Sequence, residues 1–319
     1  MALSEFEIID RYFRPRLPDR PEVVIGVGDD AAILRVPGCR DLAITVDTLV
    51  AGTHFSDDAE PEAIGYKALA VSLSDLAAMG AEPLCATLAL TLPQADETWL
   101  ERFSGGFFHL ASRHALDLVG GNISRGPLTV SVTAHGILPE GGALRRIGAQ
   151  PGDAIFVTGS LGDAALALEA LGGSHIEIAP YTHYLRTRLH RPVPRVAQGV
   201  ALRGLASSAI DVSDGLAADL GHILAANAVG AVIELDRLPR SSALQALPEL
   251  PRQWELALGG GEDYELCFTV PEIHVDKLGP DLSGVSITRI GQIQKRGGLR
   301  FIHPRGTAFV PRFHGFRHF

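Results

Sequence analysis

The sequence predicts an α/β protein with about two domains. The chain has 319 residues, and a domain usually contains about 100–200. Apolar residues make up 46% of the chain and charged residues 20%, which provides material for buried cores and excludes a disordered chain. Segments with the composition of strands alternate with helical segments along the whole length, as they do in α/β folds.

The first half is expected to contain a sheet and two helices. Strands are expected at residues 42–46, 84–92 and 130–137, and helices at residues 61–79 and 97–114. Pro61 stands in the first turn of the first helix and Gly80 follows its end, which is the usual polarity of helix termini.

A stretch rich in glycine and proline, residues 139–152, is expected to link the two domains. It separates an N-terminal domain, residues 1–138, from a C-terminal α/β domain, residues 153–319. In the second domain we expect strands at residues 154–158, 209–212, 232–235, 265–270 and 285–290, and helices at residues 164–171 and 216–226.

Charge and cysteine content exclude several classes of protein. The net charge is −9 and there is no long basic run, so nucleic acid is not expected as a partner. Cys39, Cys85 and Cys267 lack the spacing of zinc ligands or of a redox pair, and we expect buried thiols in a reducing compartment. The N-terminus does not resemble a signal peptide, and the longest run of low charge, residues 68–81, is too short to cross a bilayer. We therefore expect a cytoplasmic protein with no membrane partner.

The segment TGSLGD at residues 158–163 resembles a phosphate-binding loop. It lacks the lysine of a Walker sequence and the full spacing of a dinucleotide-binding turn. We expect a plain turn from a strand into a helix.

Aspartates stand at places where a fold alone would not require them. Asp30 follows a glycine-rich run and Asp47 ends a predicted strand, and either could belong to an ordinary turn or a solvated strand end. Asp75 has small and apolar helical neighbours, and an unpaired buried carboxylate costs several kcal/mol or takes up a proton. Asp75 is therefore either a cation ligand or a partly exposed helix residue.

Further acids follow in the second half. Asp211 and Asp214 stand where a strand runs into a helix, and Ser213 and Asp214 could instead cap that helix. Three glycines precede Glu262, which lets the backbone approach a ligand closely. Scattered carboxylates suit Mg²⁺, which takes oxygen ligands and usually bridges to substrate phosphates. Bound Mg²⁺ would also explain how an acidic protein binds anions.

Eight segments, in order, resemble the thiamine-monophosphate kinase family of bacteria. They are GVGDDAA (26–32), TVDTLVAGTHF (45–55), SLSDLAAMGAEP (72–83), GGNISRG (120–126), VTGSLGDA (157–164), DVSDGLAADL (211–220), GGEDYEL (260–266) and GFRHF (315–319). The resemblance implies a two-domain fold like that of aminoimidazole ribonucleotide synthetase, with an N-terminal mixed sheet and helices forming the core of a homodimer. It also implies transfer of phosphate from ATP to thiamine monophosphate, giving thiamine pyrophosphate, with several Mg²⁺ ions.

The resemblance also assigns roles to single residues. Mg²⁺ ligands would be Asp30, Thr45, the Val46 carbonyl, Asp47, Asp75, Asn122, Asp211 and Asp214. ATP would contact Gly121, Asn122, Arg146 and Ser213, and thiamine monophosphate would contact His54, Glu262 and Phe316. Asn122 stands where the family usually has Asp, and Phe316 where it often has Trp.

The resemblance leaves no residue with a chemical role of its own in the transfer. The acceptor is a phosphate, largely a dianion at pH 7, so it needs no general base. We expect direct in-line transfer, driven by positioning and by neutralisation of charge. The alternatives are a sister ATP-dependent synthetase on the same fold and a non-catalytic protein that binds nucleotide or thiamine phosphate. GGEDYEL and GFRHF favour the kinase over the synthetase.

Overall fold

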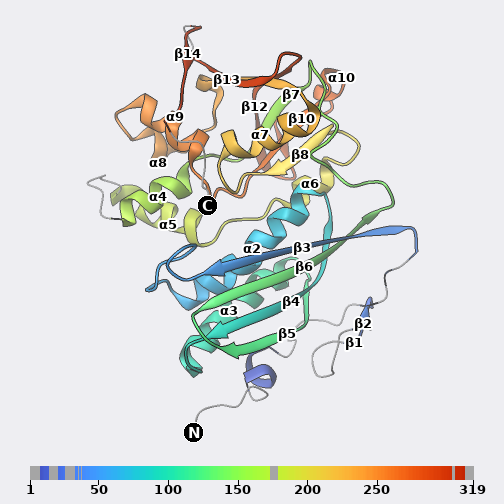
Figure 1. Ribbon diagram of the computed structural model, residues 1–319, viewed down its shortest axis with the longest axis vertical. Helices are drawn as coiled ribbons and strands as arrows, with labels where there is room; N and C mark the ends of the chain where they lie inside the picture. The colour runs from blue at the N-terminus through green and yellow to red at the C-terminus, as the bar shows by residue number, and fades with distance from the viewer. Residues whose placement is uncertain are drawn as a thin grey trace. The chain divides into compact units, whose positions relative to one another are not determined.

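The computed structural model describes residues 8–13, 21–25, 33–34, 36, 38–172, 179–303 and 306–312. The chain divides into two compact units (Figure 1). Unit 1 lies within residues 1–76 and 81–141, and unit 2 within residues 77–80 and 142–319.

Unit 1 is a four-stranded sheet with two long helices behind it in Figure 1. The strand order is β3 (Arg40–Val50), β6 (Thr129–Pro139), β4 (Glu82–Leu92) and β5 (Asp117–Arg125), and the helices are α2 (Pro61–Ala78) and α3 (Glu97–Arg113). β4 and β5 are parallel while the other neighbours are antiparallel, so the predicted mixed sheet is confirmed. A short π-helix, η1 (Ile9–Phe13), and the strands β1 (Val23–Ile25) and β2 (Ile33–Leu34) complete the described elements of unit 1.

The two faces of this sheet differ in burial. Val130, Val132 and Ala134 of β6 are fully buried on one face, which also carries Thr45 and Asp47 of β3 because paired residues share a face. Side chains of the opposite face are open: Ile44 is 61% exposed and Val46 62% exposed. The covered face forms the core of unit 1, and the other is open, with exposed apolar side chains along β3.

Two glycines let α2 and α3 pack with their backbones in contact. A Cβ atom on Gly65 would lie 2.1 Å from the Phe103 carbonyl oxygen, and one on Gly106 would lie 1.9 Å from the Glu62 carbonyl oxygen. Glycine costs a helix about 1 kcal/mol relative to alanine. Here the two glycines permit an approach that no side chain would allow, and this contact sets the spacing between α2 and α3.

We predict that Gly106→Ala destabilises unit 1 by at least about 2 kcal/mol, because the new methyl group would overlap the backbone of α2. Its neighbour Gly105 is exposed, and a Cβ there meets nothing within 4 Å. Gly105→Ala is therefore the matched control and should be neutral or up to about 1 kcal/mol more stable. Urea unfolding of both variants measures their free energies of unfolding and tests this prediction. Equal stabilities would show that the helices can separate at no cost.

Unit 2 is built on an eight-stranded sheet. The main strand order is β14 (Ala308–Phe309), β13 (Gly298–Ile302), β9 (Gly230–Glu234), β12 (Val285–Gln294), β7 (Ala154–Thr158), β10 (Leu266–Val270) and β8 (Ser208–Asp211), with β11 (Asp281–Leu282) pairing beside β12. The helices are α4 (Asp163–Leu171), α5 (Thr182–His190), α6 (Val196–Ala201), α7 (Leu216–Asn227), α8 (Ser242–Gln245), α9 (Leu250–Gly259) and α10 (Glu272–Val275), with short 3₁₀ turns η2 (Ala179–Tyr181) and η3 (Leu235–Arg237). Trp254 of α9 is the largest side chain in its core.

Every strand and helix expected from the sequence is present, with ends shifted by at most a few residues. Several elements were not expected, among them β5, α5, α6 and α9. The prediction of three buried thiols is wrong for Cys39, which is exposed, whereas Cys85 and Cys267 are buried. Cys39 lies in the bend before β3 with φ of 61°, outside the core. Among the described residues, no helix is long and apolar enough to cross a membrane.

Candidate functional site

Unit 1 brings three predicted metal ligands together on the covered face of its sheet. Thr45 and Asp47 come from β3 and Asp75 from α2. The Thr45 hydroxyl donates a hydrogen bond to Asp75 Oδ2. Ser72 Oγ lies 2.9 Å from Asp47 Oδ2 and 3.2 Å from the Val132 carbonyl oxygen. These contacts tie the edge strand, the helix and the neighbouring strand at one point.

The carboxylates of Asp47 and Asp75 are both half-buried, and their negative charges repel each other. Burial, and secondly the charge of Asp75, raise the pKa of Asp47 from 3.8 to about 6, although the Ser72 hydrogen bond lowers it. Carboxylate and hydroxyl oxygens are the ligands that Mg²⁺ takes, so the donor set fits that ion. Within the described ranges, however, no group of three His, Cys, Asp or Glu residues has the geometry to hold a metal. Asp30 lies outside the described residues.

Gly121 and Asn122 lie far from this pair. They belong to β5, at the opposite edge of the sheet from β3, and three strand spacings amount to about 14 Å. The register places Asn122 beside Ala89, on the open face, whereas Asp47 faces the helices. Within one chain, then, the structure does not bring Asn122 to Asp47. A Cβ on Gly121 would lie 1.9 Å from the Leu88 carbonyl oxygen, so the pairing with β4 requires glycine there.

Val46 and His54 come from β3 and the loop after it. Val46 lies on the edge strand with its side chain on the open face. His54 Nδ1 accepts a hydrogen bond of 3.1 Å from the Val50 amide, and its carbonyl oxygen accepts one of 3.3 Å from Lys67 Nζ. Because Nδ1 is an acceptor, Nε2 carries the proton of the neutral ring. The loop therefore holds the imidazole in one orientation.

Unit 2 gathers Asp211, Ser213 and Asp214 at the end of β8. Asp211 is buried, and the two others lie in the loop that leads into α7. Sequence reasoning allowed Ser213 and Asp214 to cap α7, and this interpretation is wrong, because the N-cap residue is Gly215 and no side chain caps it. Asp219, one turn into the helix, holds the loop instead.

Asp219 was missed as a functional candidate. Its Oδ2 accepts hydrogen bonds from the amides of Asp214, at 3.1 Å, and Gly215, at 3.0 Å. Burial and then the charge of Asp214 raise the pKa of Asp219 to about 7. An acid a few positions after a strand-to-helix loop is the available sequence signal, because such a side chain can turn back to the loop amides.

Glu262 is held against the same loop. The Glu262 amide lies 2.8 Å from the Ser213 carbonyl oxygen, and the Tyr264 amide 2.8 Å from that of Val212. A Cβ on Gly261 would lie 2.6 Å from the Ser213 carbonyl oxygen, so this contact requires glycine. Unit 2 thus places Glu262 beside Ser213 and Asp214, while Phe316 lies outside the described residues.

Arg146 lies on a segment that runs along β8. The Arg145 carbonyl oxygen accepts a hydrogen bond of 2.9 Å from the Ala209 amide. Asn227, the last residue of α7, binds the backbone on both sides: its Nδ2 lies 2.8 Å from the Arg146 carbonyl oxygen and its Oδ1 lies 2.7 Å from the Gly148 amide. The Arg146 side chain is exposed.

The turn at residues 158–163 joins β7 to α4, so the prediction of a strand-to-helix turn is confirmed. Its Gly162 amide lies 2.8 Å from Asp263 Oδ2. That amide, the natural donor to a phosphate at a helix start, is already taken by a carboxylate.

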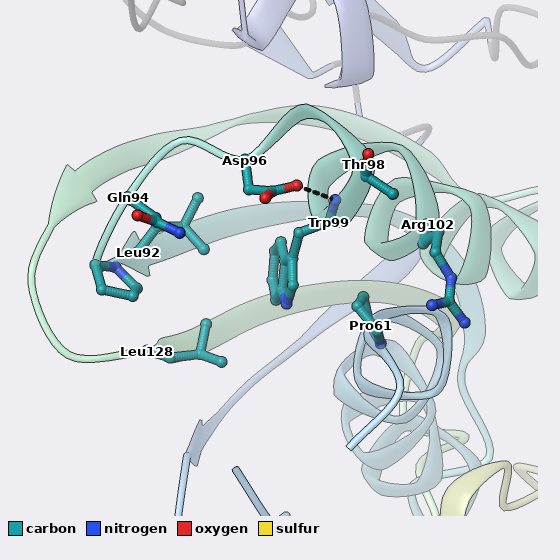
Figure 2. A pocket seen from close by; sticks show the side chains of 9 residues that line it. Pro61, Leu92, Gln94, Asp96, Thr98, Trp99, Arg102 and Leu128 are labelled. Carbon is teal, nitrogen blue, oxygen red and sulfur yellow. Dashed lines mark hydrogen bonds between the residues drawn. The ribbon is translucent and has the colours of Figure 1, made fainter. Parts of the chain in front are cut away.

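A separate hollow of about 340 Å³ opens beside the start of α3 in unit 1 (Figure 2). Trp99 stands in its middle, stacked on Phe103 with ring centroids 4.9 Å apart, and Asp96 caps the Trp99 amide at 2.8 Å. Pro61, Leu92, Leu128 and Arg102 border it. Of the predicted metal, ATP and substrate ligands that the structure describes, none lines this hollow.

Both halves of the chain match one family. The description "AIR synthase related protein" fits residues 28–138 for its N-terminal domain and residues 150–304 for its C-terminal domain. Thiamine-monophosphate kinase of Escherichia coli K12 is 50% identical over 100% of this chain and 99% of its own. That of Salmonella typhimurium is 48% identical over 100% of this chain and 99% of its own.

Solved structures agree. A thiamine-monophosphate kinase from Stenotrophomonas maltophilia superposes with a TM-score of 0.88 at 46% identity, covering 97% of this chain and 99% of that one. A structure described as AaThiL complexed with AMPPCP and TMP has a TM-score of 0.78 at 33% identity and covers 89% of each chain. These likenesses extend over both units and include the segments that carry Asp47, Asp75, Asp211 and Glu262, and the chain belongs to the thiamine-monophosphate kinase family.

Proposed function

We propose that the protein phosphorylates thiamine monophosphate with ATP, giving thiamine pyrophosphate and ADP, in the cytoplasm. The observation that carries this proposal is identity of about half over the full length with kinases of that name. A relative that is 33% identical is described in complex with AMPPCP and TMP. The pair of Asp47 and Asp75, whose charges repel, is the arrangement that such a reaction would use.

Several Mg²⁺ ions are proposed as part of the active enzyme. In unit 1 the ligands would be Asp47, Asp75, Thr45, the Val46 carbonyl and Asp30. In unit 2 they would be Asp211 and Asp214. Asn122 of unit 1 would be a further, neutral oxygen ligand. When bound, the cations supply positive charge for the phosphates of donor and acceptor.

The residues of this chain bind and orient the two substrates. Arg146, Ser213 and Gly121 would contact ATP, with Arg146 as a fixed positive charge. Glu262, His54 and Phe316 would contact thiamine monophosphate. The acceptor phosphate is largely a dianion at pH 7 and attacks without a general base. We infer direct in-line transfer of the γ-phosphoryl group, with the rate set by alignment of two anions that would otherwise repel each other.

A homodimer is proposed through the open face of the unit 1 sheet. Leu42, Ile44 and Val46 form an exposed apolar row along β3, with exposures of 39%, 61% and 62%. A contiguous apolar surface of this kind is typical of an interaction site. Asn122 lies on the same face, so in this dimer it would face the second copy rather than Asp47 of its own chain.

We predict ADP release from MgATP only when thiamine monophosphate is present. A sister synthetase would not respond to that substrate, and a non-catalytic binding protein would bind it without turnover.

Asp47→Asn should lower kcat/KM at least about a hundredfold, since it removes a charged ligand from the pair. Circular dichroism should remain unchanged. Wild-type rates in that variant at low Mg²⁺ would contradict the role of the pair.

The pKa of Asp47 in the metal-free protein provides a second prediction. Asp75→Asn should lower it from about 6, because a neighbouring negative charge is removed, and Ser72→Ala should raise it, because a stabilising hydrogen bond is removed. NMR titration of the carboxyl carbon measures both, and shifts in the same direction would refute the assigned causes. Because the pKa of Asp47 in the folded protein is above the ordinary aspartate value of 3.8, the free energy of unfolding of metal-free protein should fall as the pH rises from about 4 to about 6.

A charged substitution on the open face of the unit 1 sheet tests the proposed dimer. Ile44→Glu should raise the dissociation constant at least about tenfold, because a carboxylate would be buried in an apolar contact. Ile273→Glu is the control, since Ile273 of unit 2 is 82% exposed and lies outside the proposed interface. Light scattering across a dilution series gives the mass of each. A dimer unaffected by Ile44→Glu would place the interface elsewhere.

A further inference from the structure

The turn that carries Glu262 has an unfavourable backbone. Glu262 has φ of 70° and Tyr264 has φ of 50°, both in the left-handed region. For residues other than glycine this conformation is sterically unfavourable, because Cβ comes too close to the following carbonyl oxygen. Such a conformation persists only where surrounding contacts determine it. Asp263, between the two, is 1% exposed and points inward.

Asp263 anchors the middle of this turn. Its Oδ2 accepts a hydrogen bond of 2.8 Å from the Gly162 amide, at the start of α4. An extended backbone would turn this side chain away from Gly162, because side chains alternate along a strand. The hydrogen bond and the left-handed conformation of the flanking residues therefore depend on each other.

Glu265 anchors the end of the turn and is fully buried. Arg195 binds it with two hydrogen bonds of 2.6 Å, one to each carboxylate oxygen. Arg188 Nη2 adds a contact of 3.1 Å to Oε1, and Thr158 Oγ1 donates to Oε2 at 2.6 Å. Buried ion pairs add little net stability because desolvation offsets their attraction, but they restrict geometry strongly. The carboxylate of Glu265 can hold only one position among these four donors.

We propose that Asp263 is a positioning residue for thiamine monophosphate, and that the Glu265 cluster, made of Glu265, Arg188, Arg195 and Thr158, supports it. Asp263 acts through Glu262: it keeps the turn in the conformation that presents Glu262 beside Ser213. The proposal rests on the proposed function, because Glu262 matters here as a contact of the acceptor substrate. Neither Asp263 nor the cluster touches the reacting phosphates.

Asp263→Leu tests this directly. Leucine has the same branching and number of side-chain heavy atoms but accepts no hydrogen bond from Gly162, whereas Asp263→Asn keeps an acceptor oxygen. With wild-type turnover established, Asp263→Leu should raise the KM for thiamine monophosphate at least about tenfold, and more than it changes kcat. Asp263→Asn should stay within about threefold of wild type. A leucine variant with a lowered Tm and an unchanged KM would show a structural role only and overturn the proposal.

A double variant separates action through Glu262 from a general effect. Glu262→Ala alone should raise the same KM, and Asp263→Leu added to it should raise the KM no further, because the contact that Asp263 positions is already gone. Multiplying effects would overturn the proposal. If Asp263→Leu does not fold, Thr158→Val and its control Thr158→Ser replace it, with a raised KM expected for valine only. An equal KM in that pair also overturns it. Absence of turnover in the wild type would overturn the proposed function and this inference together.

Discussion

Asp47 and Asp75 carry like charges, and unit 1 holds them close through contacts that resist their repulsion. α2 is buried on nearly all sides, and it approaches α3 through Gly65 until backbone meets backbone. Ser72 of the same helix binds both Asp47 and the Val132 carbonyl oxygen. The carboxylates therefore cannot relax apart. Burial, and secondly the charge of Asp75, raise the pKa of Asp47. A cation relieves the repulsion, so the same constraint that costs the metal-free fold stability favours metal binding.

In unit 2 the main feature is a set of contacts that hold two loops in fixed conformations. The loop with Ser213 and Asp214 and the turn with Glu262 meet through main-chain hydrogen bonds and a contact that only glycine permits. Glycine gives this close approach but leaves amides that need acceptors. Asp219 accepts from the loop amides of Asp214 and Gly215, and Asp263 ties the Glu262 turn to the Gly162 amide at the start of α4. The proposed binding groups thus lie on short loops that buried carboxylates hold in place.

The sequence predicted the elements whose signals are local. β3, β4 and α2 follow from apolar runs and termini. Asp75 was found because a carboxylate on an apolar helix face conflicts with burial, whereas Asp47, at the end of the predicted strand, could have been a solvated strand end, and β3 continues past it to Val50. β5 was missed because Gly120, Gly121 and Asn122 resemble a turn; the need for glycine at position 121 arises from the Leu88 carbonyl on another strand. Asp219 was missed because the capping rule points to the residues before a helix, while here the acceptor lies inside it. In the first case the contact is with a distant strand, and in the second the side chain turns back to the loop before its own helix. A local sequence pattern does not reveal either contact.

Acidic residues therefore have two separate tasks in this protein. Half-buried acids such as Asp47 in β3, Asp75 in α2 and Asp214 in the loop before α7 would keep oxygens available for cations that meet anionic substrates. Fully buried acids such as Asp263 and Glu265 accept hydrogen bonds from amides and arginines, and burial raises the pKa of Asp263 well above its usual value. A net charge of −9 in a protein that handles phosphates is then not a contradiction. Some of the acidic residues hold the backbone in place from inside the protein. Others carry negative charge that bound cations would neutralise.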